Sequence, residues 1–287
     1  TSAERPTPIY WFSSDEIVAE DETAVEICRN EKHYKIEREI LRPYFKPTKK
    51  AEKGLNSYSI LATDKQIIFP YDQQWRLFTI DYMKSHFPGT VAYLEDYYDR
   101  LVPKCVSNQC VRDVPNATPD TWYQYGRTQA LTAFINTPKL IVGVLSKEPM
   151  YILDTNDILI ASGGTAGYCA VSKKEGSPYA LEYLQAWLSN PITENILEIV
   201  GSDFENGFIA RGTFVLSTLP FVELDFSDRK QREIHDSVVA ASRRIYSINA
   251  ELMNHPAKRI ATVLQDEKNS LIHKIQGLIE KVYRLGY

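Results

Sequence analysis

The sequence predicts an α+β fold: a β-rich lobe that extends to about residue 227, followed by two long helices paired as a hairpin. Three observations predict it. Short β-branched or aromatic runs separated by turn residues fill the first part, as in KQIIFPY and KLIVGVL. A few amphipathic stretches interrupt these runs. From Arg232 onward, apolar residues recur alternately four and three positions apart, which is the spacing of a coiled-coil seam.

The lobe is expected to contain antiparallel or mixed sheets, because its runs do not alternate with helices as in a βαβ series. Residues 90–102 form one amphipathic helical face of about three turns. A second helical stretch starts at Tyr179, and Asn190-Pro191 is expected to break it into two pieces. The runs expected to form strands are SYSILA, KQIIFPY, RLFTI, KLIVGVL, YILD, DILIAS, GYCAVS and GFIARGTFVLS.

The C-terminal hairpin consists of two helical runs joined by a short connection that contains Pro256. We place the domain boundary near Ser227, where residues 225–228 can cap the first helix. The hairpin has two possible roles: it braces the lobe, or its first seam binds partner helices. The seam positions are Ile234, Val238, Ala241, Ile245, Ile248 and Leu252, then Leu264, Leu271, Ile275, Leu278, Val282 and Leu285.

Composition places the chain among folded globular proteins. Its 287 residues are 44% hydrophobic and 24% charged, enough for one large domain or two smaller ones. No apolar run approaches the ~20 residues of a membrane span, and the N-terminus has no secretory signal. The four cysteines offer neither a disulfide framework nor zinc-ligand spacing. We therefore expect a cytoplasmic protein that does not contact a membrane.

Charge is unevenly distributed along the chain. A net charge of −4 and a pI near 5.8 argue against a nucleic-acid partner. The first thirty residues are acidic, whereas the stretch REILRPYFKPTKKAEK from Arg38 is basic. Such a basic stretch is either a solvated face or a site for an anionic partner.

Catalytic motifs are absent from the sequence, which lacks GxxxxGK[ST], GxGxxG, HExxH and GxSxG. The glycine-rich residues 162–167 lack a phosphate-binding lysine, and they suit a tight turn or a backbone that approaches a ligand closely. The five histidines lie far apart, and Cys169 lies in a β-branched run typical of a buried strand. We expect neither a catalytic residue nor a metal ligand in this chain.

The stretch WYQYGRTQAL, which begins at Trp122, combines aromatic rings with Arg127 and Gln129. Arg and Gln pair bidentately with base edges, and Arg also binds phosphate. The same string also suits a packed strand end with an incidental arginine. On these residues alone both interpretations stay open.

Taken in order, several stretches resemble the TaqI-like C-terminal specificity domain of adenine-specific DNA methyltransferases and type IIG restriction-modification enzymes. No single stretch is specific, but their order extends from about residue 36 to residue 285. The stretches are IEREILRPYFKPTKK, KQIIFPYD, AYLEDYYDRLVPK, WYQYGRTQAL with TPKLIVGVLS, YALEYLQAWLSNP, ENGFIARGTFVLSTLPF and HKIQGLIEKVYRLGY.

The resemblance implies a target-recognition lobe that binds double-stranded DNA and presents an adenine to an N-terminal methyltransferase domain outside this chain. That domain would hold S-adenosylmethionine and the catalytic motif, so the chain alone is not expected to be an enzyme. A start without Met agrees with a C-terminal part of a longer protein. The resemblance does not say whether that protein also cleaves DNA. A protein-interaction module that uses the first seam is the alternative function.

The resemblance also implies a set of DNA contacts. In the WYQYGR segment, Tyr125, Arg127 and Gln129 are expected at base edges or phosphates, although Trp122 can instead anchor this loop in the core. Thr165 in the glycine-rich turn would approach a groove. Phosphate binding needs positive charge at a groove edge and little geometry. The backbone contacts are expected from Arg42, Lys46, Lys49, Lys50 and Lys139.

Overall fold

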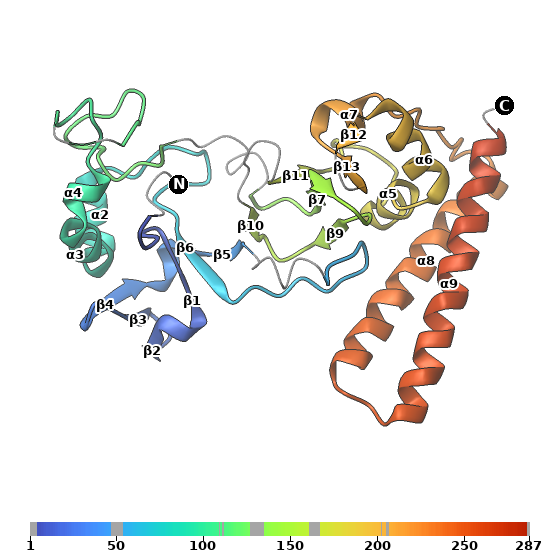
Figure 1. Cartoon of the computed structure of the whole chain (residues 1–287), viewed down its shortest axis with the longest axis horizontal. Coiled ribbons are helices and arrows are strands. Elements are labelled where there is room, and N and C mark those ends of the chain that lie inside the picture. Colours follow the sequence, from blue (N-terminus) through green and yellow to red (C-terminus); the bar gives the residue numbers. More distant parts are fainter. Residues whose placement is uncertain are drawn as a thin grey trace. The chain divides into compact units, whose positions relative to one another are not determined.

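A computed structural model describes residues 5–46, 54–108, 110, 112–126, 135–160, 167–201, 203–204 and 207–285. The chain packs into two compact units, each built from three segments of sequence. The first unit comprises Thr1–Lys46, Thr63–Ile135 and Asp157–Ala161, and the second comprises Pro47–Ala62, Asn136–Asn156 and Ser162–Tyr287. The α+β class and the C-terminal helical hairpin are confirmed (Figure 1).

Two sheets form the β part of the first unit, one with the strand order β1-β6-β5-β10 and one with the order β2-β3-β4. Strand β10 runs parallel to β5, and the other pairs within these two sheets are antiparallel. Ile67 and Tyr44 are buried in the core of this unit. The strands are β1 (Trp11–Ser13), β2 (Ile17–Glu20), β3 (Ala24–Arg29), β4 (Lys32–Glu37), β5 (Leu41–Phe45), β6 (Lys65–Ile68) and β10 (Leu159–Ile160), with 3-10 turns at Ser14–Glu16 and Arg38–Ile40.

Helices α2 (Ile80–His86), α3 (Pro88–Asp96) and α4 (Tyr98–Leu101) complete the first unit. The single helix expected over residues 90–102 is divided at Tyr97, whose φ of −108° and ψ of 16° are not helical. Glu37 of β4 caps α3, because its carboxylate accepts hydrogen bonds from the amides of Gly89 at 2.8 Å and Thr90 at 2.9 Å. This contact fixes the start of α3 against the neighbouring sheet.

The second unit contains the sheets β11-β7-β9 and β12-β13-β8. The predicted break at Asn190-Pro191 is confirmed, because the Asn190 side chain caps the next helix by accepting from the Ile192 amide at 2.9 Å. The elements are β7 (Lys139–Gly143), β8 (Leu145–Ser146), β9 (Tyr151–Asp154), β11 (Tyr168–Val171), α5 (Leu181–Leu188), α6 (Pro191–Val200), β12 (Asp203–Phe204), β13 (Phe208–Ala210), α7 (Thr213–Ser217), α8 (Arg229–Met253) and α9 (Lys258–Leu285).

The long helices α8 and α9 lie side by side and belong to the second unit (Figure 1). Asp228 caps α8, as expected, by accepting from the Lys230 amide at 2.7 Å. Val238 and Ile279 share one hydrophobic core with Leu140 of β7 and with helix α5. The compact units therefore divide the chain differently from the boundary expected near residue 227. None of the helices within the described residues is long and apolar enough to cross a membrane.

The run SYSILA at residues 57–62, expected as a strand, forms a turn at residues 57–58 and has no regular secondary structure after it, within the second unit. Side chains take the place of strand partners here. Gln185 donates from Nε2 to the Ser57 carbonyl and to the Tyr151 carbonyl, the latter at 2.7 Å. Asn249 donates to the Tyr58 carbonyl at 2.6 Å. Because buried backbone carbonyls need hydrogen-bond donors from some source, these side chains make a non-strand conformation stable.

Candidate nucleic-acid interface

The expected DNA contacts fall into two groups. Some lie outside the described residues, namely Lys49, Lys50, Arg127, Gln129 and Thr165. The structure describes the others, namely Arg42, Lys46, Tyr125 and Lys139. For the first group, the structure describes only residues that precede or follow them in the sequence.

Two strands that precede such residues in the sequence, β5 and β10, end side by side at one edge of a sheet. Strands β5 and β10 are parallel neighbours, and the last residue of β5, Phe45, lies opposite the last residue of β10, Ile160. Because parallel strands end at the same edge, the chain leaves both of them at adjoining positions. Lys46, the last described residue before the lysine-rich stretch, follows β5, and Ile160, the last described residue before the glycine-rich stretch, ends β10.

Cationic and aromatic side chains lie on the same sheet. Trp11 of β1 and Arg42 of β5 both pair with Ile67 of the strand between them, so they share one row across the sheet. The Lys46 ammonium lies 5.3 Å from the centre of the Trp11 ring. Arg42 donates to backbone carbonyls, including that of Glu39 at 2.8 Å. Positive charge combined with an aromatic face suits phosphates and bases.

Tyr125 belongs to the core of the first unit. It is 3% exposed, and its ring lies 5.0 Å from that of Tyr10 and 5.2 Å from that of Tyr71. Its hydroxyl donates to the Ile68 carbonyl, and burial raises its pKa well above the ordinary value. Trp122 is buried too, at 5% exposed. Trp122 and Tyr125 therefore anchor the WYQYGR segment in the core of the first unit. The expectation that Tyr125 contacts DNA is corrected, because its side chain is buried.

Lys139 is also placed in the interior, at 1% exposed. Its Nζ lies 2.6 Å from a carboxylate oxygen of Asp154, and the two residues face each other on β7 and β9. A phosphate contact needs a charge at an accessible edge. The expectation that Lys139 contacts the DNA backbone is therefore corrected, because its ammonium forms a buried ion pair within the sheet.

The acidic N-terminal stretch is partly neutralised within the first unit, where three of its carboxylates pair with basic residues of β3, β4 and the turn after β4. Arg38, the first cation of the basic stretch, thereby forms an ion pair with Glu20. The net charge of −4 therefore does not describe the local charge at β5. The pairs are Glu16–Arg29, Glu20–Arg38 and Asp21–Lys35.

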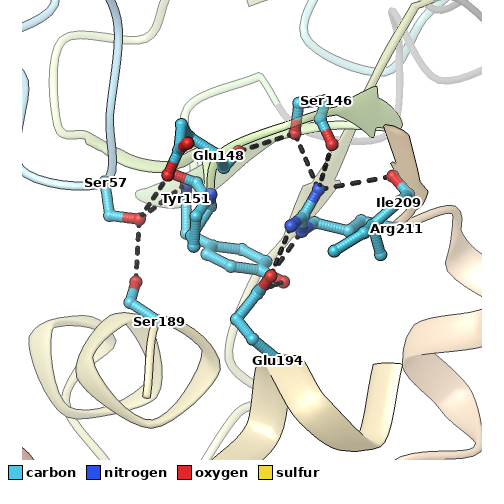
Figure 2. Close-up of polar contacts among 9 residues, drawn as sticks. Ser57, Ser146, Glu148, Tyr151, Ser189, Glu194, Ile209 and Arg211 are labelled. Atoms are coloured by element: carbon cyan, nitrogen blue, oxygen red, sulfur yellow. Dashed lines mark hydrogen bonds and ion pairs between the residues drawn. The ribbon is translucent and has the colours of Figure 1, made fainter. Parts of the chain in front are cut away.

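A buried polar network braces the second unit (Figure 2). Arg211 is fully buried, and its Nε donates to Glu194 at 3.2 Å while Nη1 donates to the Ser146 carbonyl at 2.7 Å. The Tyr151 hydroxyl donates to Glu194 at 3.0 Å, and desolvation raises the pKa of this phenol well above its ordinary value. Because the charged groups are buried and paired with each other, the network joins strands to α6 and offers no reactive group. The sequence pattern does not signal this pair.

A pocket of about 300 Å³ lies in the second unit. The Arg243–Glu182 ion pair, with a separation of 2.8 Å, and the Tyr246 side chain are part of its lining. Within the part of the chain that the structure describes, no group of His, Cys, Asp and Glu side chains could hold a metal ion.

One exposed loop of the first unit carries polar side chains that the sequence pattern does not mark as a site. Residues 72–76, with the sequence DQQWR, form a loop closed by a bridge between Tyr71 and Leu77. The available signal was the adjacent glutamines and arginine directly after the FPY of an expected strand. The adjoining run RLFTI hides this signal, because its β-branched and aromatic residues predict a strand, whereas the structure has only an isolated bridge at Leu77 there.

Comparison with known proteins finds no family model that matches the chain. The chain is 30% identical over 258 residues to the type II restriction enzyme and methyltransferase RM.Eco57I of Escherichia coli. The match includes 88% of this chain and 25% of that protein. The chain thus spans about a quarter of the length of the curated relative it matches. It is similar to one part of a restriction-modification protein.

Proposed function

We propose that this chain is the DNA target-recognition part of a restriction-modification protein, which presents an adenine to a methyltransferase domain outside the chain. The observation that carries the proposal is the similarity to RM.Eco57I, which includes 88% of this chain. A similarity of that breadth reaches into both compact units, so it supports a role for the chain as a whole.

The resemblance to TaqI-like specificity domains supports the same division of labour. In the proposed mechanism, this chain binds duplex DNA and reads a short site in the major groove. The separate domain would then flip the adenine out of the stack and transfer to it a methyl group from S-adenosylmethionine. The sequence of this chain contains none of the catalytic motifs considered above, which agrees with a recognition role.

The proposed contacts follow from where segments begin. Arg42 and Lys46 on the β5 sheet, continued by Lys49 and Lys50, contact the DNA backbone. Arg127 and Gln129 follow the anchored Tyr123 and Tyr125, and Thr165 follows the end of β10. Each phosphate neutralised by a lysine or arginine releases counterions, so binding should weaken as salt rises.

The alternative function, binding of partner helices by the first seam, has less support. Val238, Ile245 and Ile248 of this seam are all 0% exposed. Val238 and Ile245 lie in the core cluster of the second unit, together with residues of α5 and α9. The seam is therefore already covered within the chain. We assign α8 and α9 the role of bracing the second unit.

Selection from a pool of randomised DNA duplexes tests the proposal. We expect the chain to enrich one short motif. The double variant Arg42→Ala/Lys46→Ala should keep the motif but bind less tightly, with a salt dependence reduced by about two ionic contacts. The control Arg229→Ala/Lys230→Ala removes equal charge from the start of α8 and should change neither quantity. An absence of enrichment would exclude sequence recognition by this chain.

A further inference from the structure

The loop of residues 72–76 exposes side chains that are suited to reading DNA bases. Gln73 and Gln74 are exposed, and the Arg76 side chain is 74% exposed. Arginine pairs bidentately with guanine, and glutamine pairs bidentately with adenine. The loop therefore combines both kinds of reader within a few residues.

Asp72 holds this loop in one conformation. Its Oδ1 accepts from the backbone amides of Gln74 at 2.8 Å and Arg76 at 2.9 Å. Its Oδ2 accepts from Nε of Arg76 at 2.8 Å, and Gln74 accepts from Nη2 at 3.2 Å. Among the described residues, Nη1 of Arg76 has no partner. Asp72 and Gln74 hold the guanidinium through Nε and Nη2, so it has less rotamer freedom to lose on binding. Nη1 remains for a base, and Nη2 would exchange Gln74 for the base to complete a bidentate contact.

The backbone of the loop is strained at Trp75, whose φ is +66°. The left-handed region is disfavoured for a bulky side chain, and strained residues concentrate at binding sites. The other non-glycine residues with positive φ in the described chain are Asn, Asp, Glu or His. The Trp75 ring packs partly buried against the core of the first unit. It thereby fixes the loop tip to the body of the unit.

The WYQYG segment braces the loop on both sides. Before the loop, the Tyr71 hydroxyl accepts from the Tyr125 amide at 2.8 Å. After the loop, the Phe78 carbonyl accepts from the Tyr123 hydroxyl. Arg127 follows Tyr125 by two residues. The loop and the segment proposed to contact DNA therefore start from one aromatic cluster.

We infer that residues 72–76 form a base-reading loop for duplex DNA, in which Arg76 contacts a guanine and Gln73 contacts an adenine. This inference rests on the proposed function and extends it to a loop that the resemblance does not assign. The Asp72 carboxylate opposes contact with phosphate, so the loop suits base edges better than the backbone. An aspartate can also accept from the cytosine amino group.

The test repeats the duplex selection with Arg76→Ala. At one guanine of the selected motif, discrimination should fall by roughly 5- to 150-fold, the loss of one bidentate contact. Arg76→Lys keeps the charge but not the fork, so it should lose the same discrimination and retain the salt dependence. The matched control is Arg229→Ala: this side chain is 84% exposed and is ion-paired to Glu233 four residues away at 2.7 Å. The control should leave the motif unchanged.

The outcomes separate the two claims. If the unmodified chain enriches a motif and Arg76→Ala keeps full discrimination at every position, the loop does not read bases, while DNA recognition by the chain stands. If the unmodified chain enriches no motif, the proposed function and this inference fall together. If Arg76→Ala and Arg76→Lys unfold at the same denaturant midpoint as the unmodified chain, an altered motif does not come from loss of fold.

Discussion

At the scale of single residues, one missing Cβ allows α3 to start against the sheet. A Cβ on Gly89 would lie 2.1 Å from the Lys35 carbonyl oxygen, which is backbone and cannot move aside. Gly89→Ala should therefore lower the free energy of unfolding by about 1–3 kcal/mol, as overpacking does. Gly277→Ala in α9 is the control, because a Cβ there meets nothing within 4 Å. That variant should be more stable by about 0.5–1 kcal/mol. Urea unfolding that gave the same sign for both would contradict this account.

The buried ion pair of Lys139 permits a second test at this scale. Lys139→Ala leaves the Asp154 carboxylate buried without its cation, so the free energy of unfolding should fall by about 3–5 kcal/mol. Lys32→Ala breaks a pair of similar length, 2.9 Å to Asp96, whose lysine side chain is 65% exposed. Its cost should be below about 1 kcal/mol. A stable Lys139 variant with weakened DNA binding would restore Lys139 as a DNA contact.

At the scale of elements, a regular apolar pattern separates what the sequence predicts from what it misses. The predictions of the α8 seam, of the break before Pro191 and of a strand at β7 are confirmed, because each follows from a local pattern or a cap. The sequence analysis misses strands β2 to β4, because it relies on uninterrupted β-branched or aromatic runs and these segments contain charged residues, some of which lie opposite each other in the sheet, as Glu26 and Lys35 do. The predicted strand at residues 57–62 is wrong, because backbone carbonyls there accept hydrogen bonds from side chains distant in sequence, such as Gln185.

The hairpin gives a test at the same scale. Ile245 of α8 is 0% exposed, so Ile245→Ala should lower the free energy of unfolding by about 2–5 kcal/mol through lost burial and a cavity. Val263 of α9 is 61% exposed, and Val263→Ala should change it by less than about 0.5 kcal/mol. Chemical unfolding followed by circular dichroism measures both. Equal small effects would mean that the seam is not part of the core of the second unit.

At the scale of the whole molecule, each compact unit combines segments from distant parts of the sequence. The order of strand-like and helical patterns along the chain cannot show this. A boundary placed near residue 227, where strand-like runs give way to a helical repeat, therefore does not match the packing into two units. The same limit applies to the candidate site. Arg and Gln in the sequence indicate base contacts, yet only tertiary contacts show that Lys139 and Tyr125 are covered and that Asp72 orders Arg76.

Sequence-specific binding of DNA is the central claim, and one measurement addresses it most directly. The affinity of the chain for its selected duplex is compared with that for a scrambled duplex of equal length and composition, between about 50 and 200 mM salt. We predict at least ~10³-fold tighter binding of the selected duplex, with both affinities falling as salt rises. Equal affinity for the two duplexes, or no binding at the lowest salt, would contradict the assignment of this chain as a recognition module.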